Sequence, residues 1–146
     1  MAITQAIANA FKKQLLEGDQ NFSSGGDVFK LALYTSSATL NSATTSFTTT
    51  NEVANSGTYA SGGGDLTGQN TSIASGVAIV DFADLSFTGV TLTARGALIY
   101  NTSSAVTNAA VAALDFGADK TATSGTFTIQ FPAFTTSAAI LRIGNA

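Results

Sequence analysis

Short apolar stretches separated by turn residues fill the second half of the chain, and they limit the possible folds more than any other feature. The clearest precedes the single proline, where Phe127, Ile129 and Phe131 alternate with polar residues. Apolar residues at every second position indicate a strand with one buried face. Strands are predicted at 76–82, 85–89, 90–101, 109–117, 125–132 and 138–144. Strands this short, separated by Gly and Asn, predict a mainly β protein: an antiparallel β-sandwich, jelly-roll-like, or a barrel.

Residues 4–17 have a different period and predict one N-terminal α-helix. Their apolar stripe recurs every four residues and consists of Ile3, Ile7, Phe11 and Leu15. Thr4 could cap the start of this helix, and Gly18 stands where a left-handed residue would end it. Such a stripe needs a surface to cover it. Docking on the chain's own domain is the simpler interpretation, and docking on a neighbouring subunit is the alternative.

Residues 35–76, which follow a predicted strand at 27–36, are rich in Ser, Thr, Gly and Asn. About forty residues without any order would be unusual inside a compact domain. We therefore expect long loops around short strands near 46–50 and 57–60. The predicted organisation is a single domain, 1–146, with a helix at 1–18 and a β domain at 27–144.

Composition argues against several classes of function. The chain has no histidine and no cysteine, which removes the commonest general base, the commonest transition-metal ligand and every thiol. Only 10% of its residues are charged and the net charge is −3, so no binding to nucleic acid or to a membrane is expected. No apolar run approaches the roughly 20 residues of a membrane-spanning helix, and we expect no signal peptide.

The sequence contains no nucleotide-binding, EF-hand or zinc-protease motif. DFAD at 81–84 and DFGAD at 115–119 each hold two carboxylates, which in a cleft could act as acid and base. Each pair stands at a predicted strand end, where Asp commonly caps a turn, and we interpret both as turn chemistry. The sequence therefore predicts no catalytic residue, no cofactor, no metal site and no enzyme activity.

Arg95, within TARGALIYNT (93–102), is one of only six basic residues. Alternation places it on a threonine-bearing face of the predicted strand, where its guanidinium could reach a carboxylate. Asp81, Asp84 and Asp115 are the candidate partners inside the domain. A contact with another chain is the alternative.

A set of sequence blocks resembles small virion proteins of tailed bacteriophages and their prophage relatives. The blocks are MAITQAIANAFKKQLLEG, FKLALYTSSATL, TTTNEV, ARGALIYN, LDFGADKTATSGTFTIQFP and AAILRIG. They run from residue 1 to about residue 144, with a weaker middle at 51–80. The resemblance implies a non-enzymatic structural protein of the virion. It would be a head decoration or cement protein, with a tail or neck component as the second choice.

The resemblance also implies where the protein works and what it contacts. It would assemble into virions in the bacterial host cytoplasm, on other virion proteins and above all on the major capsid protein. Particle symmetry suggests self-association as a trimer or dimer. The N-terminal helix and the 35–76 segment are expected to make the contacts. The candidate contact residues are Ile7, Phe11, Leu15, Phe47, Tyr59 and Arg95.

A carbohydrate-binding module is the alternative from another class, because β-sandwiches often present sugar sites. Sugar platforms favour exposed aromatic rings. This chain has no Trp, and its only tyrosines are Tyr34, Tyr59 and Tyr100.

Overall fold

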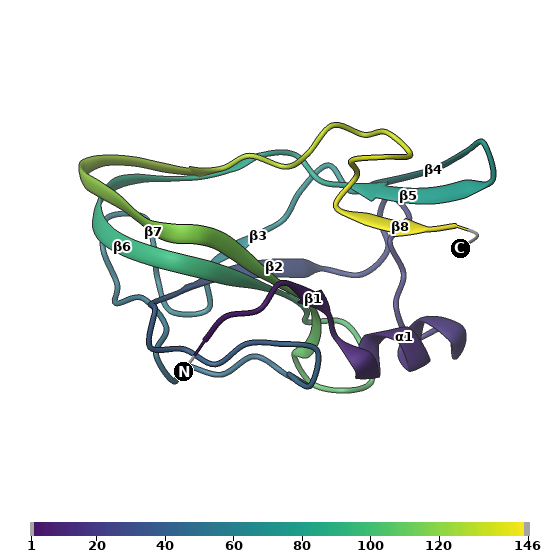
Figure 1. Cartoon of the computed structure of the whole chain (residues 1–146), viewed down its shortest axis with the longest axis horizontal. Coiled ribbons are helices and arrows are strands. Elements are labelled where there is room, and N and C mark those ends of the chain that lie inside the picture. Colours follow the sequence, from purple (N-terminus) through teal and green to yellow (C-terminus); the bar gives the residue numbers. More distant parts are fainter. Residues whose placement is uncertain (1, 145–146) are drawn as a thin grey trace.

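Two long antiparallel strands, β6 (Leu85–Asn101) and β7 (Ala109–Ile129), pair along nearly their whole length and shape the protein (Figure 1). They are seen in a computed structural model that describes residues 2–144. Both belong to a five-stranded antiparallel sheet in the order β1-β7-β6-β2-β3. The other members are β1 (Ala6–Ile7), β2 (Phe29–Tyr34) and β3 (Gly64–Asp65).

A second sheet of three antiparallel strands has the order β4-β5-β8. Its members are β4 (Asn70–Ala74), β5 (Val77–Asp81) and β8 (Leu141–Ile143). The predicted fold class is confirmed, since the protein is mainly β, with two antiparallel sheets and one short N-terminal helix. The arrangement is consistent with a sandwich, and the sheets are not closed into a barrel.

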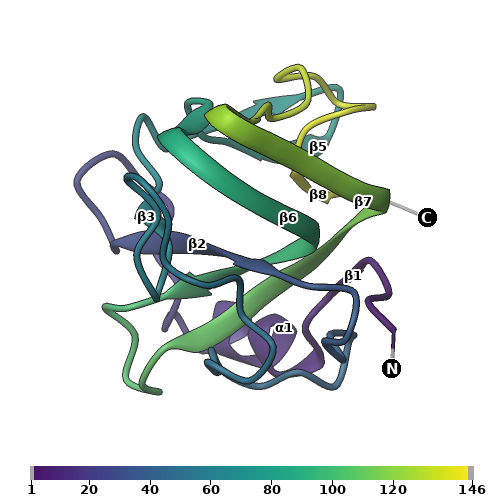
Figure 2. The same cartoon turned by 90° about the vertical axis from the view of Figure 1, so that its left-hand side faces the viewer.

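β6 and β7 bend strongly and so contribute to both layers (Figure 2). The bends accompany shifts in strand register. Between Ala94 and Gly96 on β6, the paired residues on β7 run from Lys120 to Asp115. The chain advances five residues on β7 for two residues on β6, so β7 has three extra residues that form a bulge. Gly117, inside this bulge, has a φ of +80°, which glycine adopts without strain. Because bulges increase local twist and bending, they let one strand pair serve two layers.

The N-terminal helix is shorter than predicted. Helix α1 spans Asn9–Leu16 rather than 4–17, and Thr4 does not cap it. Ala8 precedes the helix and makes no side-chain cap. The predicted first turn instead contains β1, which pairs with β7, because sheet hydrogen bonds outweigh the weak intrinsic preference for one more helical turn. Gly18, with a φ of +77°, follows the helix in the predicted left-handed conformation.

Some predicted strands merge in the structure. The stretches 85–89 and 90–101 are one strand, β6, and 109–117 continues into most of 125–132 as β7. The glycines that suggested turns are instead the sites of bulges within continuous strands. Gly89, between the two predicted parts of β6, has a φ of +62° and stands at a register shift.

The prediction of short strands at 46–50 and 57–60 is wrong. These stretches contain only the isolated bridges Ser46↔Ala109 and Ser56↔Tyr59. β3 and β4 form nearby without having been predicted. β4 is exposed along its whole length, so its sequence carries no alternation of apolar and polar residues that would mark it as a strand.

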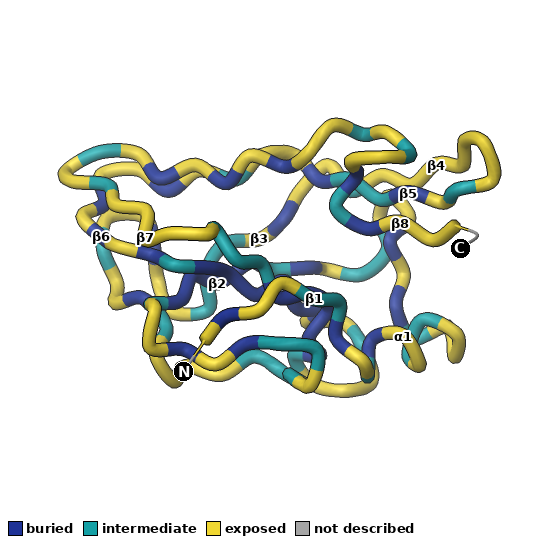
Figure 3. The backbone as a smooth tube through the Cα atoms, in the orientation of Figure 1, coloured by how far each residue is buried: buried dark blue, intermediate teal, exposed yellow. Residues whose placement is uncertain are grey.

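Aromatic rings join the two sheets. Phe22 stacks on Phe29 of β2 with ring centroids 4.3 Å apart, and Phe82, directly after β5, contacts both. Phe11 of α1 and Phe131 after β7 complete the cluster, and all five side chains are buried. Buried residues concentrate on β2 and on the halves of β6 and β7 that pair beside it (Figure 3). Each well-oriented ring pair adds about 0.5–1.5 kcal/mol beyond the burial of its area.

The long Ser- and Thr-rich loops lie against the five-stranded sheet and are held there by tyrosines. The Tyr34 hydroxyl donates to the carbonyl of Thr48, and the Tyr100 hydroxyl donates to the carbonyl of Gly62, both at 2.6 Å. Phe47 stacks on Tyr100 with centroids 4.7 Å apart. These contacts explain how a segment with few large apolar residues is ordered.

Substituting Gly96→Ala should destabilise the protein. A Cβ at this position would clash with the backbone carbonyl oxygen of Leu114 and lie 2.8 Å from Ile3. We expect a loss of about 1–3 kcal/mol in the free energy of unfolding, measured by chemical denaturation. Gly125→Ala is the matched control, because its nearest neighbour, the Thr123 carbonyl oxygen, is 3.5 Å away. Equal stability of the two variants would contradict this packing.

Candidate functional site

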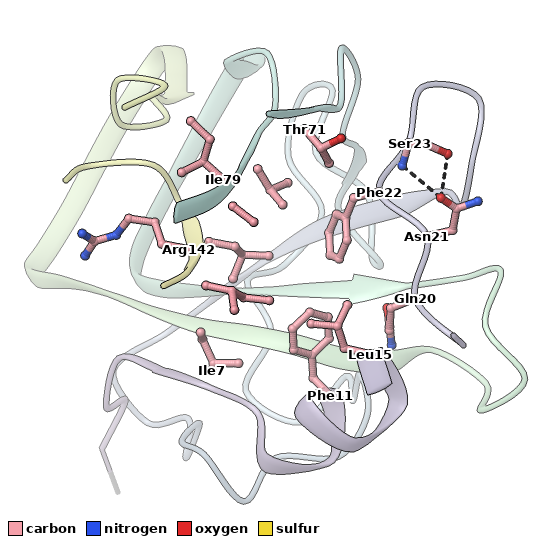
Figure 4. A pocket seen from close by; sticks show the side chains of 14 residues that line it. Ile7, Phe11, Leu15, Gln20, Asn21, Phe22, Ser23, Thr71, Ile79 and Arg142 are labelled. Atoms are coloured by element: carbon pink, nitrogen blue, oxygen red, sulfur yellow. Dashed lines mark hydrogen bonds between the residues drawn. The ribbon is translucent and has the colours of Figure 1, made fainter. Parts of the chain in front are cut away.

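Three of the predicted contact residues meet in one groove between α1 and the three-stranded sheet (Figure 4). Ile7 comes from β1, and Phe11 and Leu15 come from α1. Phe22 and the strands β4, β5 and β8 complete the lining of this groove, whose volume is about 340 Å³. We call it the end groove. Phe11 is buried while Ile7 and Leu15 are half-buried against the core, so the helix docks on its own domain, as the simpler interpretation predicted.

The sheet wall of the end groove is apolar and extends beyond it. Residues opposite each other on antiparallel strands project from the same face. Val80 and Leu141 form the inner row, which packs on the core. The next row consists of Ile73, Ala78 and Ile143, in which Ile73 is 74% exposed and Ile143 is 60% exposed. Apolar surface therefore continues from the groove into solvent.

Phe47 and Tyr59 lie away from the end groove. Tyr59 is only 1% exposed. Its hydroxyl donates to Glu52 Oε1 at 2.8 Å and accepts the N–H of Leu33 at the same distance. Phe47 is half-buried on Tyr100. The structure thus places Tyr59 in the core rather than on the surface, while the Phe47 side chain remains partly exposed.

Arg95 pairs with Asp115, one of its three predicted partners, with Nε and Oδ1 3.1 Å apart. The same Oδ1 accepts the N–H of Gly117 at 2.9 Å. The hydrogen bond from the Gly117 N–H is the main cause that lowers the pKa of the Asp115 carboxyl, and the hydrogen bond from Arg95 lowers it further. This contribution to stability is therefore present at neutral pH and is lost as the pH falls through the lowered pKa. The intradomain interpretation is confirmed, and a contact of Arg95 with another chain stays a prediction.

The prediction that both Asp pairs cap turns at strand ends holds only in part. DFGAD lies inside β7 rather than at its end, and there Asp115 Oδ1 accepts the N–H of Gly117 within the bulge. Asp84 Oδ1 accepts the N–H of Phe131 at 2.9 Å, a bond between segments 47 residues apart rather than within a turn. Within residues 2–144, no three acidic side chains gather closely enough to hold a metal ion. No helix in this range has the length and apolar character to cross a membrane.

Sequence reasoning missed the sheet wall of the end groove. The alternation in AAILRIG predicted a strand near Ile143, and GVAIVDF predicted one near Val80. Neither stretch indicates that the two strands are neighbours, and β4, with Ile73, carried no strand signal. Strand order comes from tertiary packing, which local periodicity does not encode.

Comparison with known proteins does not assign the chain to a family. No family model, curated protein or solved structure matches it.

The three tyrosines should resist ionisation in the folded protein. Burial is the main cause that raises the pKa of each phenol, to about 12 for Tyr100 and further for Tyr34 and Tyr59. A raised pKa stabilises the fold below the ordinary value of 10.0, and this contribution is lost as the pH rises above it. At about pH 11 we expect little phenolate absorbance while circular dichroism stays native, and ionisation on unfolding. A tyrosine that titrates near its ordinary pKa in the folded state would contradict this account.

Proposed function

We propose that the chain is a non-enzymatic structural protein of a tailed-phage virion, and that it is a decoration or cement protein of the head. The sequence blocks that resemble small virion proteins cover the chain nearly from end to end. A tail or neck component is the second candidate, because the same resemblance supports both positions.

The observation that carries this proposal is apolar surface left open at the end groove. Ile73 and Ile143 extend the sheet wall of the groove into solvent. Leu16 of α1, which does not line the groove, is 90% exposed. Exposed apolar residues that adjoin a groove mark surfaces that another molecule covers. A cement protein needs such a surface on a fold that is stable by itself. The buried aromatic cluster contributes to such stability.

A carbohydrate-binding module receives less support. Stacking on a sugar requires an aromatic ring at the surface. Tyr34, Tyr59 and Tyr100 are all buried, at 0%, 1% and 3% exposure. Their hydroxyls are also used inside the protein, to hold loops to the five-stranded sheet.

On this proposal the partners are other virion proteins, first among them the major capsid protein. Further copies of this chain, as a trimer or dimer, would contact one another around the symmetry axes of the particle. A neighbour that binds only the folded chain would also raise its apparent stability by mass action.

The proposal predicts the number of copies in each particle, which quantitative mass spectrometry of purified virions measures. A head decoration protein should be present on the order of hundreds of copies, in simple ratio to the major capsid protein. A handful of copies would instead assign it to the neck or tail. Particles from a phage that lacks the gene are the control for carried-over host protein. Absence of the chain from washed virions would contradict both positions.

A further inference from the structure

The outer edge of β7 is unpaired over most of its length. Its inner edge pairs with β6 along most of its length, but the outer edge is bonded only near its start, at 109–113, by β1, Ala8 and the loop at 45–47. Over 116–129, no backbone hydrogen bond joins the outer edge to any other described segment. Free edges of this kind are templates for another strand. The regular part, 125–129, is the better template, because a bulge distorts 116–119.

Three hollows lie on one side of the sandwich, which we call the open side, and β7 lines the first of them. The first, of about 430 Å³, is lined by Phe116, Lys120, Phe127 and Ile129 within the bend of β7. The second, of about 330 Å³, lies between Gln5 and Pro132, and it shares Ile7 and Arg142 with the end groove, which is the third. In Figure 1, β8 and the end of β7 lie above β1 and the first half of β7.

The charged side chains that line the three hollows have one sign, although Asp119 stands beside Lys120 on β7. The residues that line the three hollows include Lys120 and Arg142 but neither Asp nor Glu. Lys13, Lys30 and Arg95 are each paired with a carboxylate elsewhere in the protein. Within residues 2–144, Lys120 and Arg142 have no such partner. The hollows therefore favour acidic over basic groups in a ligand.

We propose that the open side receives an extended segment of a different virion protein, in which apolar residues alternate with acidic ones. Its backbone pairs with β7 at 125–129, its apolar side chains enter the hollows, and its carboxylates meet Lys120 and Arg142. Strand addition of this type gains affinity from main-chain hydrogen bonds and specificity from side-chain pockets. The identity of the partner as a virion protein rests on the proposed function.

A second copy of this chain is a poorer occupant. Tyrosine hydroxyls hold the long loops at 35–62 against the five-stranded sheet, and these loops offer only one acidic residue, Glu52. Both of its carboxylate oxygens already accept hydrogen bonds, from Tyr59, Ser61 and the Gly62 N–H.

The test selects binders for the full chain from a library of random peptides of about 12 residues, which reach roughly 40 Å when extended. We expect enriched peptides in which apolar and acidic residues alternate. Lys120→Glu and Arg142→Glu should each raise the Kd of a synthetic copy of a selected peptide about tenfold, because attraction between the exposed charges becomes repulsion. Lys12→Glu is the matched control, since Lys12 is exposed, carries the same charge change and lines none of the hollows; it should leave the Kd unchanged.

Binding should also perturb the amide resonances of 116–130 and 141–143 in an NMR titration of the wild-type chain. Failure to enrich any peptide, equal binding by all variants, or perturbation confined to 35–62 would overturn the inference. Self-association that Arg142→Glu abolishes would assign the open side to a second copy and would also overturn the inference.

If the Lys120→Glu, Arg142→Glu double variant remained on virions at wild-type copy number, the inference would fail while the proposed function stood. Absence of the wild-type chain from virions would defeat the proposed function itself.

Discussion

The pairing of β6 with β7 is the interaction on which the rest of the structure depends. This hairpin forms most of the five-stranded sheet, and it bends at its bulges from one layer toward the other, while the three-stranded sheet consists of β4, β5 and β8. β2 can then pair with β6 on one side and β1 with β7 on the other. Among the described residues, the later half of β7 has no outer neighbour.

A chain with so few charges cannot rely on ion pairs, and its described residues form only three. Cohesion comes instead from an aromatic cluster between the sheets and from tyrosine hydroxyls that hold the loops. Glu52 is an example. Its carboxylate accepts hydrogen bonds from the Tyr59 and Ser61 hydroxyls and from the Gly62 N–H, and so fixes the turn of the chain around it. A half-buried carboxylate that accepts three hydrogen bonds from one loop favours a single loop conformation.

Much of the fold could be predicted because its strands obey a simple period. Phe127 and Ile129 are buried, as their alternation predicted. The extent of the helix could not be predicted, because the backbone of Ala6 and Ile7 satisfies a sheet that only the tertiary structure supplies. The β6 and β7 strands appeared divided because glycine at a bulge has the same local signal as glycine at a turn.

The candidate site was predictable only in part. Ile7, Phe11 and Leu15 share a stripe that sequence periodicity reveals, and they do line one groove. Tyr59 illustrates the opposite case, because composition cannot distinguish a tyrosine that faces a partner from one that anchors a loop. The sheet wall, with Ile73 and Ile143, depends on strand order and was outside the reach of local patterns.

The most direct test of whether the open side is the surface that binds the virion is amide hydrogen exchange. It is measured on the free chain and on the chain bound to virions. In the free chain we expect slow exchange in β2 and in the paired edges of β6 and β7, and fast exchange of the outward amides of 125–129. On the particle these outward amides should become protected, together with 141–143. New protection confined to the 35–62 loops, or none at all on bound chains, would contradict the account.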